Sequence, residues 1–214
     1  MNSEKYKIMD ECRENLLKYT FKAFSLIPKP DNPIILDIGC GTGVPTLALA
    51  ENFNGIIYAV DSDKSSLTWL QKKIDESKYS DRIKIIHASI NENYLFNINF
   101  DIILAEGFLN VIGFEKGLPV LVKHIKSKGY IIIHDEIKDD ARKKDIFKKY
   151  NLNLIGSFRL DKNEWWDDYY RCMEAGIKSL NDDSLFKNEI SEIKEYKKNP
   201  ESFKSIYYIL QFAG

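Results

Sequence analysis

A short apolar segment followed by a glycine-rich loop constrains the fold of this chain more than any other feature. Residues 34–38 have no hydrophilic face, which predicts a central parallel strand covered on both sides. Gly39, Gly41 and Gly43 then allow a ligand to approach bare backbone. Pro45 suits the first turn of a helix, whose free N–H groups point back at the loop. The segment predicts a binding loop for a nucleotide-type ligand, and a tight turn without a ligand is the alternative.

The next apolar segment, residues 56–60, ends in acidic residues that suit the same kind of ligand. Asp61 follows the loop by about twenty residues, at the expected tip of the neighbouring strand, where a βαβ nucleotide fold binds both ribose hydroxyls. Asp63 is better suited to cap the helix that follows. We therefore assign Asp61 to a ribose, with a simple turn residue as the alternative.

The loop spacing and one acidic residue distinguish between the nucleotide ligands. A dinucleotide fingerprint reads G-x-G-x-x-G, whereas this loop reads G-x-G-x-G with Asp37 two positions before its first glycine. An acid there would repel a pyrophosphate, which disfavours a nicotinamide dehydrogenase, but it suits the ammonium and sulfonium groups of S-adenosylmethionine. The stretch resembles the D-x-G-x-G-x-G loop of the class I S-adenosylmethionine-dependent methyltransferase family, and the run 105–118 is similar to its small-molecule, methyltransferase type 11-like members.

This resemblance implies a single-domain, Rossmann-like α/β fold. Its seven-stranded sheet has the order 3-2-1-4-5-7-6, with an antiparallel last strand and helices on both faces. Apolar segments fit these strands at residues 34–38, 56–60, 82–87, 100–105, 130–133, 153–158 and 205–212. An apolar stripe at helical spacing predicts one N-terminal helix within residues 1–28, and residues 161–203 are expected to form a helical insertion before the last strand.

The resemblance also implies the remaining cofactor contacts. Ser89 stands where many of these enzymes have an acid that binds the adenine amino group, and Ile90 beside it offers an apolar shelf. The tip of the fourth strand should abut the glycine loop where the strand order reverses. The expected cofactor residues are Asp37, Gly39, Cys40, Gly41, Gly43, Asp61, Ser62, Ser89, Ile90, Ala105 and Glu106.

Three further assignments concern catalysis. Attack on a sulfonium methyl group is an in-line displacement, so alignment of the reactants supplies most of the rate and a base is needed only if the acceptor loses a proton. Glu106 and His134 are the best placed bases, and the hydroxyl of Tyr169 or Tyr170 would orient the acceptor. A structural role is the alternative for His134.

The insertion begins with four large aromatic residues in six positions, Trp165, Trp166, Tyr169 and Tyr170. In a helix, Trp165 and Tyr169 share one face and the other two share the adjacent face. We expect the insertion to form a lid over the acceptor pocket, with Trp166 and Tyr170 on the acceptor side. The alternative is that all four side chains anchor the insertion on the sheet.

Composition and charge set the outer limits. The 214 residues, 44% of them hydrophobic, suffice for one well-buried domain. A net charge of −1 gives no general attraction to nucleic acid or to a membrane surface. No apolar run reaches membrane-spanning length and the polar N-terminus is no signal peptide, so we expect a cytoplasmic protein. Cys12, Cys40 and Cys172 are widely spaced and predict neither a disulfide framework nor a metal site.

Together these features predict an S-adenosylmethionine-dependent methyltransferase that acts on a small-molecule acceptor. A non-catalytic module that only binds S-adenosylmethionine is the main alternative. Methylation of arsenite or of a thiol would need cysteines that converge on the cleft, which this sequence does not suggest.

Overall fold

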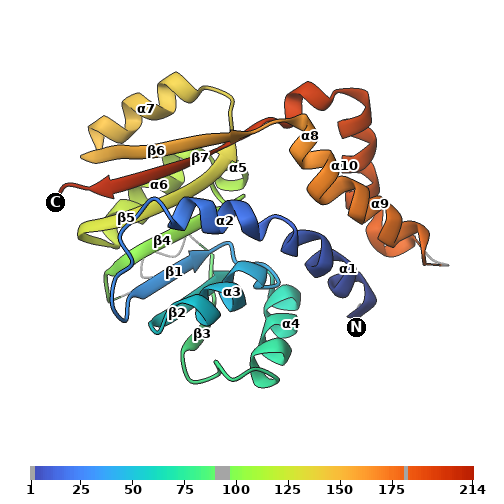
Figure 1. The fold of residues 1–214 in the computed structure, drawn as a ribbon, viewed down its shortest axis with the longest axis horizontal. Helices are drawn as coiled ribbons and strands as arrows, with labels where there is room; N and C mark the ends of the chain where they lie inside the picture. The colour runs from blue at the N-terminus through green and yellow to red at the C-terminus, as the bar shows by residue number, and fades with distance from the viewer. Residues whose placement is uncertain (1–2, 90–96, 181–182) are drawn as a thin grey trace.

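One sheet of seven strands runs through the part of the chain that the computed structural model describes, residues 3–89, 97–180 and 183–214 (Figure 1). Its order is β3-β2-β1-β4-β5-β7-β6, and β7 is antiparallel to both of its neighbours. The predicted order and the antiparallel last strand are confirmed. The strands are β1 Ile34–Ile38, β2 Ile56–Asp61, β3 Ile83–His87, β4 Phe100–Glu106, β5 Ile125–Glu136, β6 Leu152–Leu160 and β7 Ser205–Phe212.

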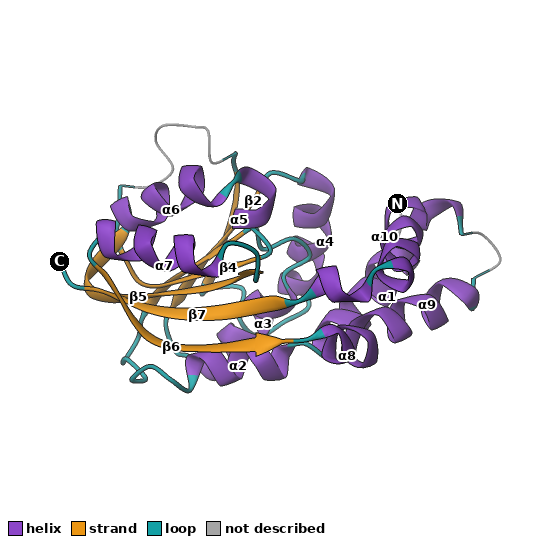
Figure 2. Cartoon of the chain, turned by 90° about the horizontal axis from the view of Figure 1, so that it is seen from above, coloured by secondary structure: helices purple, strands orange, loops and turns teal. Residues whose placement is uncertain are grey.

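Helices cover both faces of this sheet because its central strands are apolar on both sides. Ile35 and Leu36, neighbours in β1, are both buried, but they belong to different core clusters. The first cluster includes residues of α2 (Leu17–Phe24), α3 (Val44–Asn52) and α4 (Lys64–Asp75). The second includes residues of α5 (Leu109–Ile112), α6 (Phe114–Lys123) and α7 (Asp140–Lys149), which lie together in the view from above (Figure 2).

The N-terminal segment forms two helices, where the sequence predicts one. A turn at residues 15–16 separates α1 (Ser3–Glu14) from α2. The two helices have different partners: Ala23 and Phe24 of α2 join the core of the sheet, whereas Cys12 of α1 packs with the insertion. The break lets one apolar stripe serve two separate cores.

The insertion between β6 and β7 is helical and forms a core of its own with α1. It contains α8 (Lys162–Trp165), a π-helical turn at Trp166–Tyr170, α9 (Arg171–Lys178), a 3-10 turn at Ser184–Phe186, α10 (Lys187–Lys198) and a 3-10 turn at Pro200–Phe203. Cys12, Met173, Phe186 and Ile193 are buried together in this third cluster. The insertion and α1 therefore lie side by side at one end of the molecule (Figure 1).

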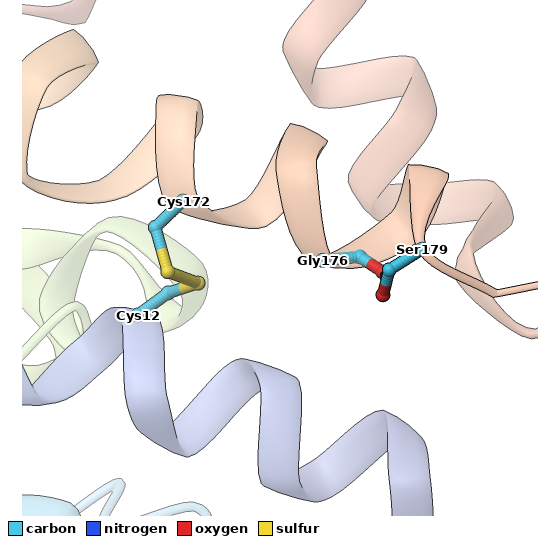
Figure 3. The surroundings of a disulfide bond; sticks show 4 residues. All are labelled: Cys12, Cys172, Gly176 and Ser179. Carbon is cyan, nitrogen blue, oxygen red and sulfur yellow. A yellow bond between two sulfur atoms is a disulfide. The ribbon is translucent and has the colours of Figure 1, made fainter.

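A disulfide bond joins these two elements, so the prediction that the cysteines form no disulfide framework was wrong. Cys12 of α1 and Cys172 of α9 are 160 residues apart in sequence, and their Cα atoms are 5.5 Å apart (Figure 3). Sequence spacing could not reveal the pair because the two helices meet only through the tertiary fold. The buried Cys40 remains a free thiol. Across the described residues, no helix is both long enough and apolar enough to cross a membrane.

Candidate active site

The glycine loop between β1 and α3 leaves open backbone at the carboxyl edge of the sheet. Gly39, Gly41 and Gly43 all have positive φ angles, of 74°, 52° and 79°. A Cβ atom on Gly43 would lie 2.2 Å from a methyl group of Leu70, and the φ of 79° would strain any side chain there. A Cβ on Gly41 would meet nothing within 4 Å. Gly43 therefore fixes the loop against α4, and Gly41 presents backbone to open space where a ligand can approach.

Asp61 holds this loop in place from the tip of β2. Its Oδ2 atom accepts a hydrogen bond of 2.7 Å from the Gly41 N–H, and its Oδ1 atom accepts one of 2.8 Å from the Asp63 N–H. Asp63 caps α4, as the sequence predicts, by accepting from the N–H groups of Ser65 and Ser66. The part-exposed Asp61 carboxylate thus lies directly beside the most open glycine.

Asp37 is a buried carboxylate under the loop, with an exposed fraction of 3%. It accepts a 2.5 Å hydrogen bond from the Thr46 hydroxyl of α3. Burial raises the pKa of Asp37 to about 7, although the Thr46 hydrogen bond acts in the opposite direction. This group therefore changes its charge near neutral pH, and a cation placed beside it would favour the ionised form.

A small cavity of about 90 Å³ lies between this loop and α1. Five of the expected cofactor residues line it: Asp37, Gly39, Cys40, Gly41 and Glu106. Asp61 does not line the cavity but binds Gly41, which does, and Ala105 is fully buried. Gly43, Ser62 and Ser89 do not line the cavity, and Ile90 lies outside the described residues.

Helix α1 closes this cavity through a buried acid that the sequence analysis missed. Asp10 accepts hydrogen bonds from Thr42 in the glycine loop, at 2.5 Å, and from Trp69 and Lys73 in α4, at 2.8 and 2.6 Å. These contacts bring Arg13, one turn later on α1, to the cavity wall. Both residues stand in a polar stretch of helix, so no local pattern marks them.

Glu106 ends β4 at the switch point of the sheet and is held by two hydroxyl groups. Its Oε1 atom accepts hydrogen bonds from Thr20 at 2.7 Å and from Tyr207 at 2.9 Å. In the described part of the chain, no group donates a hydrogen bond to Oε2. Burial raises the pKa of Glu106, and the two hydroxyls oppose this shift. One oxygen is fixed and the other is free to accept a proton or a hydrogen bond.

A second cavity, of about 730 Å³, opens on the other side of Glu106. Its walls come from the tips of β4 and β5, the start of β7, the insertion, and Arg13 and Leu16 near the N-terminus. Glu106 and Arg13 line both cavities. A group bound at the glycine loop can therefore meet a second molecule in the larger cavity across the Glu106 side chain.

His134 lies in the wall of the large cavity with its ring between two aromatic side chains. It stacks on Tyr207 at 4.1 Å and on Trp165 at 5.7 Å between ring centroids. Its Nε2 atom lies 2.8 Å from the Ser205 hydroxyl, which also accepts a hydrogen bond from Trp165. Burial lowers the pKa of His134 to about 3, so the ring stays neutral. Of the two expected bases, Glu106 has the raised pKa that suits proton acceptance, whereas the pKa of His134 is lowered.

The aromatic residues of the insertion divide in a way that the sequence analysis did not anticipate. Trp165, Tyr169 and Tyr170 line the large cavity, whereas Trp166 stacks on Tyr196 at 5.5 Å and does not line it. The prediction that Trp166 and Tyr170 lie together on the cavity side was therefore wrong for Trp166. The π-helical turn contains one residue more than an α-helical turn, so Tyr169 and Tyr170 both face the cavity together with Trp165. The Tyr170 hydroxyl donates a 2.8 Å hydrogen bond to Glu192 of α10.

Comparison with known proteins identifies a methyltransferase domain in this chain. Residues 29–205 match the family model described as a methyltransferase domain. The chain is similar to protein arginine N-methyltransferase 1 of Chlamydomonas reinhardtii, with 28% identity over 155 residues, 69% of this chain and 41% of that protein. It is also similar to the tRNA1(Val) (adenine(37)-N6)-methyltransferase of Pedobacter heparinus, with 39% identity over 72 residues, 33% of this chain and 30% of that protein. The chain thus spans less than half the length of these relatives.

Solved structures share the fold at low sequence identity. The [4+2]-cyclase SpnF superposes with a TM-score of 0.78 at 11% identity, over 91% of this chain and 80% of that one. A methyltransferase from Geobacter sulfurreducens, solved with S-adenosyl-L-homocysteine, superposes with a TM-score of 0.67 at 17% identity, over 90% and 89% of the two chains. At these identities the similarity establishes the architecture.

Proposed function

Because the chain belongs to the class I S-adenosylmethionine-dependent methyltransferase family, we propose that it transfers a methyl group from this cofactor to a small molecule in the large cavity. The observation that carries the proposal is the meeting of two cavities at Glu106 and Arg13. One cavity has the residues of the glycine loop, and the other has room for an acceptor. A bound cofactor would supply an electrophilic methyl group on its sulfonium.

The residues around the small cavity fit the charged groups of S-adenosylmethionine. Asp61 would bind the ribose hydroxyls, and Asp37 would face the α-ammonium group. Arg13 is the cation among the residues that line this cavity, and within the described part of the chain it forms no ion pair. A guanidinium group suits the carboxylate of the methionine moiety, which it can bind through two parallel hydrogen bonds.

The protein's part in the reaction is mainly to align the reactants. Glu106 would accept a proton from the acceptor at its free Oε2 atom, while Thr20 and Tyr207 keep the carboxylate in position. His134 would be a neutral ring in the cavity wall that holds Trp165 and Tyr207 in position by stacking. Tyr170 would contribute its ring to the same wall, since its hydroxyl is bound to Glu192.

Two features favour a small-molecule acceptor over the macromolecules named for the relatives. The large cavity has about 730 Å³, within the range of about 300–1,000 Å³ that is usual for small-ligand sites. The net charge of −1 gives no general attraction to nucleic acid. The shared segments with the arginine and tRNA methyltransferases cover only part of those proteins.

One experiment tests this function against a binding module without catalysis. Purified protein would be incubated with methyl-labelled S-adenosylmethionine and a small-metabolite extract, and with total tRNA and protein in parallel. We expect label in the metabolite fraction, with micromolar binding of S-adenosylhomocysteine and none of NAD by calorimetry. Label only in tRNA or protein would overturn the acceptor class, and binding without any labelled product would favour the non-catalytic module.

Removal of the Asp61 carboxylate should weaken cofactor binding. We expect Asp61→Ala to reduce S-adenosylhomocysteine affinity by about 1.5–3 kcal/mol, the usual range for hydrogen bonds to a charged group. Without this part-exposed carboxylate, the protein would lose its hydrogen bonds to the ribose and to the Gly41 N–H group. Calorimetry measures the loss, and Asp63→Ala, which removes a helix cap beside it, is the matched control. Equal affinity in Asp61→Ala and wild type would return Asp61 to a turn role.

The raised pKa of Asp37 predicts that cofactor affinity depends on pH. Below about pH 7 this buried carboxyl is protonated in the free protein, and binding of an ammonium group would require its ionisation. We expect affinity for S-adenosylhomocysteine to fall up to about tenfold per pH unit below 7, and to level off above it. In Asp37→Asn the affinity should be low and the slope absent. An unchanged slope in this variant would assign the titration to another group.

The two neighbouring tryptophans offer a matched test of the acceptor wall. Trp165 lines the large cavity and Trp166 stacks outside it, so only Trp165→Ala should lower the rate of methyl transfer. Both variants should keep S-adenosylhomocysteine affinity, because neither side chain lines the small cavity. Equal losses of rate in both variants would mean that the insertion matters only through its stability.

A cytoplasmic location stays a prediction, and the disulfide provides a way to test it. Disulfides are rare in cytoplasmic proteins because thiol systems there keep cysteines reduced. Rapid thiol labelling of freshly lysed cells would show whether Cys12 and Cys172 are free thiols or form the disulfide in the cell. Complete bonding in the cell would argue for an oxidising compartment.

A further inference from the structure

The walls of the large cavity carry more negative than positive charge. Six carboxylates line it: Glu106, Asp135, Glu136, Glu192, Glu195 and Glu201. Two of these are neutralised, since Asp135 pairs with Lys143, and Glu201 with Lys162 and Lys204. For the other four, no ion pair is found among the described residues. His134 adds no positive charge because its pKa is too low.

Few cations oppose these four carboxylates inside the cavity. Apart from the paired Lys204, the lining includes only Arg13 and Lys138. Arg13 also lines the small cavity, where it would be taken up by the carboxylate of the cofactor. An acceptor in the large cavity would therefore meet a net negative potential, which attracts a cation and repels an anion.

The same cavity presents aromatic rings between its acids. Five rings line it, those of Trp165, Tyr169, Tyr170, Phe203 and Tyr207, of which Tyr207 contributes its edge because His134 and Phe158 stack on its faces. The face of an aromatic ring attracts a cation, and a tryptophan does so most strongly. Carboxylates combined with ring faces are the surroundings that an organic ammonium group prefers, because the rings contact its carbon atoms while the acids accept its N–H groups.

Glu106 provides a defined point of attachment at the junction of the two cavities. Thr20 and Tyr207 bind one oxygen and fix the carboxylate, which leaves Oε2 without a donor within the described chain. An N–H group can fill this position, whereas a second carboxylate cannot. A group bound there would lie at the boundary between the large and the small cavity, where methyl transfer would take place.

From these features, and resting on the proposed function, we propose that the acceptor is an amine that enters the large cavity as an ammonium ion and is methylated on nitrogen. Its N–H would give a proton to Glu106 Oε2, which frees the nitrogen lone pair. The lone pair forms a bond to the methyl carbon, and the electrons of the breaking C–S bond go to sulfur. The products are the N-methylammonium ion, neutral S-adenosylhomocysteine, and one proton that leaves Glu106 for water.

Three indole compounds of one skeleton test the charge preference. Tryptamine and tryptophol carry an ammonium or a hydroxyl group on the same ethyl chain, and indole-3-acetate has a two-carbon chain that ends in a carboxylate. Calorimetry with S-adenosylhomocysteine present should show tryptamine binding about tenfold or more tighter than the other two, as expected for a charged hydrogen bond. Equal or tighter binding of tryptophol or indole-3-acetate would overturn the proposal.

A variant assigns this preference to Glu106. In Glu106→Gln the amide can still accept from Thr20 and Tyr207, but its charge is gone. We expect tryptamine binding to weaken about tenfold or more while tryptophol binding is unchanged. Glu115→Gln is the control, because this exposed glutamate pairs with Arg142 and does not line the cavity. Equal tryptamine affinity in both variants would contradict the role of Glu106.

Labelled methyl transfer separates failure of this inference from failure of the function. Pools of small amines, of alcohols and phenols, and of carboxylic acids would each be incubated with methyl-labelled S-adenosylmethionine. Label in the amine pool supports the proposal. Label only in another pool would overturn it and leave the methyltransferase function standing. Absence of label in every pool, together with absence of S-adenosylhomocysteine binding, would overturn both.

Discussion

Glu106→Gln is expected to lower kcat for methyl transfer by about 10²- to 10⁴-fold, the usual contribution of a positioned general base. Glutamine keeps the size of the side chain and can still accept the hydrogen bonds from Thr20 and Tyr207, but it cannot take a proton. Steady-state rates with an amine acceptor would measure the loss. Because the fold of the site is retained, the effect should appear in kcat more than in the stability of the protein.

A pH profile distinguishes this role from a merely structural one. Burial raises the pKa of Glu106, so the wild-type rate should fall as pH decreases through a value above that of an ordinary glutamate. The carboxylate is the active form, and the acid limb should therefore disappear in Glu106→Gln. Glu115→Gln should keep both the rate and the limb. A wild-type rate in Glu106→Gln would show that the acceptor reacts without this base.

Loss of the Cys12–Cys172 disulfide is expected to cost about 2–5 kcal/mol of unfolding free energy, the range found for native disulfides. The bond closes a loop of 160 residues, so in the chain-entropy account it restricts the unfolded chain strongly. Cys12→Ala and Cys172→Ala should each show this loss in urea unfolding. Alanine avoids a new polar group at a site where Cys12 is fully buried.

Reductant offers an internal control for this prediction. It should destabilise the wild-type protein by the same amount and leave the Cys12→Ala, Cys172→Ala double variant unaffected. Cys40 is not bonded, and its buried thiol should contribute nothing to the difference. Equal stability of the reduced and oxidised wild-type protein would mean that the contacts between α1 and the insertion hold without the bond.

Sequence patterns predict the bounds of a strand well where its apolar residues form an uninterrupted run. Residues 34–38 and 205–212 have the predicted bounds, because both are apolar runs flanked by turn residues. In contrast, β5 extends from Ile125 to Glu136, beyond the predicted residues 130–133. Its first part contains Lys126, Ser127, Lys128 and Gly129, which show no apolar strand pattern. Ile125 pairs with Phe100 of β4, and the register between the two strands shifts before Ile102.

The sequence by itself determined the apolar strands at the centre of the sheet, the glycine loop and the cap that Asp63 forms on α4. These features depend on residues close together in the chain, such as an apolar run, a glycine that must adopt positive φ, or an acid that caps the helix just after it. Local chemistry of this kind can be read without knowing which distant segments meet.

Only the tertiary structure decided how the second half of the site is assembled. Glu106 is oriented by Thr20 and Tyr207, which are 86 and 101 residues away, and Cys12 is bonded to Cys172 across 160 residues. Arg13 reaches both cavities because Asp10 binds α1 to the glycine loop and to α4. Such contacts leave no periodic signal in the sequence, because each depends on where several packed elements come together. A single irregular turn at residues 166–170 is enough to change which ring faces the large cavity.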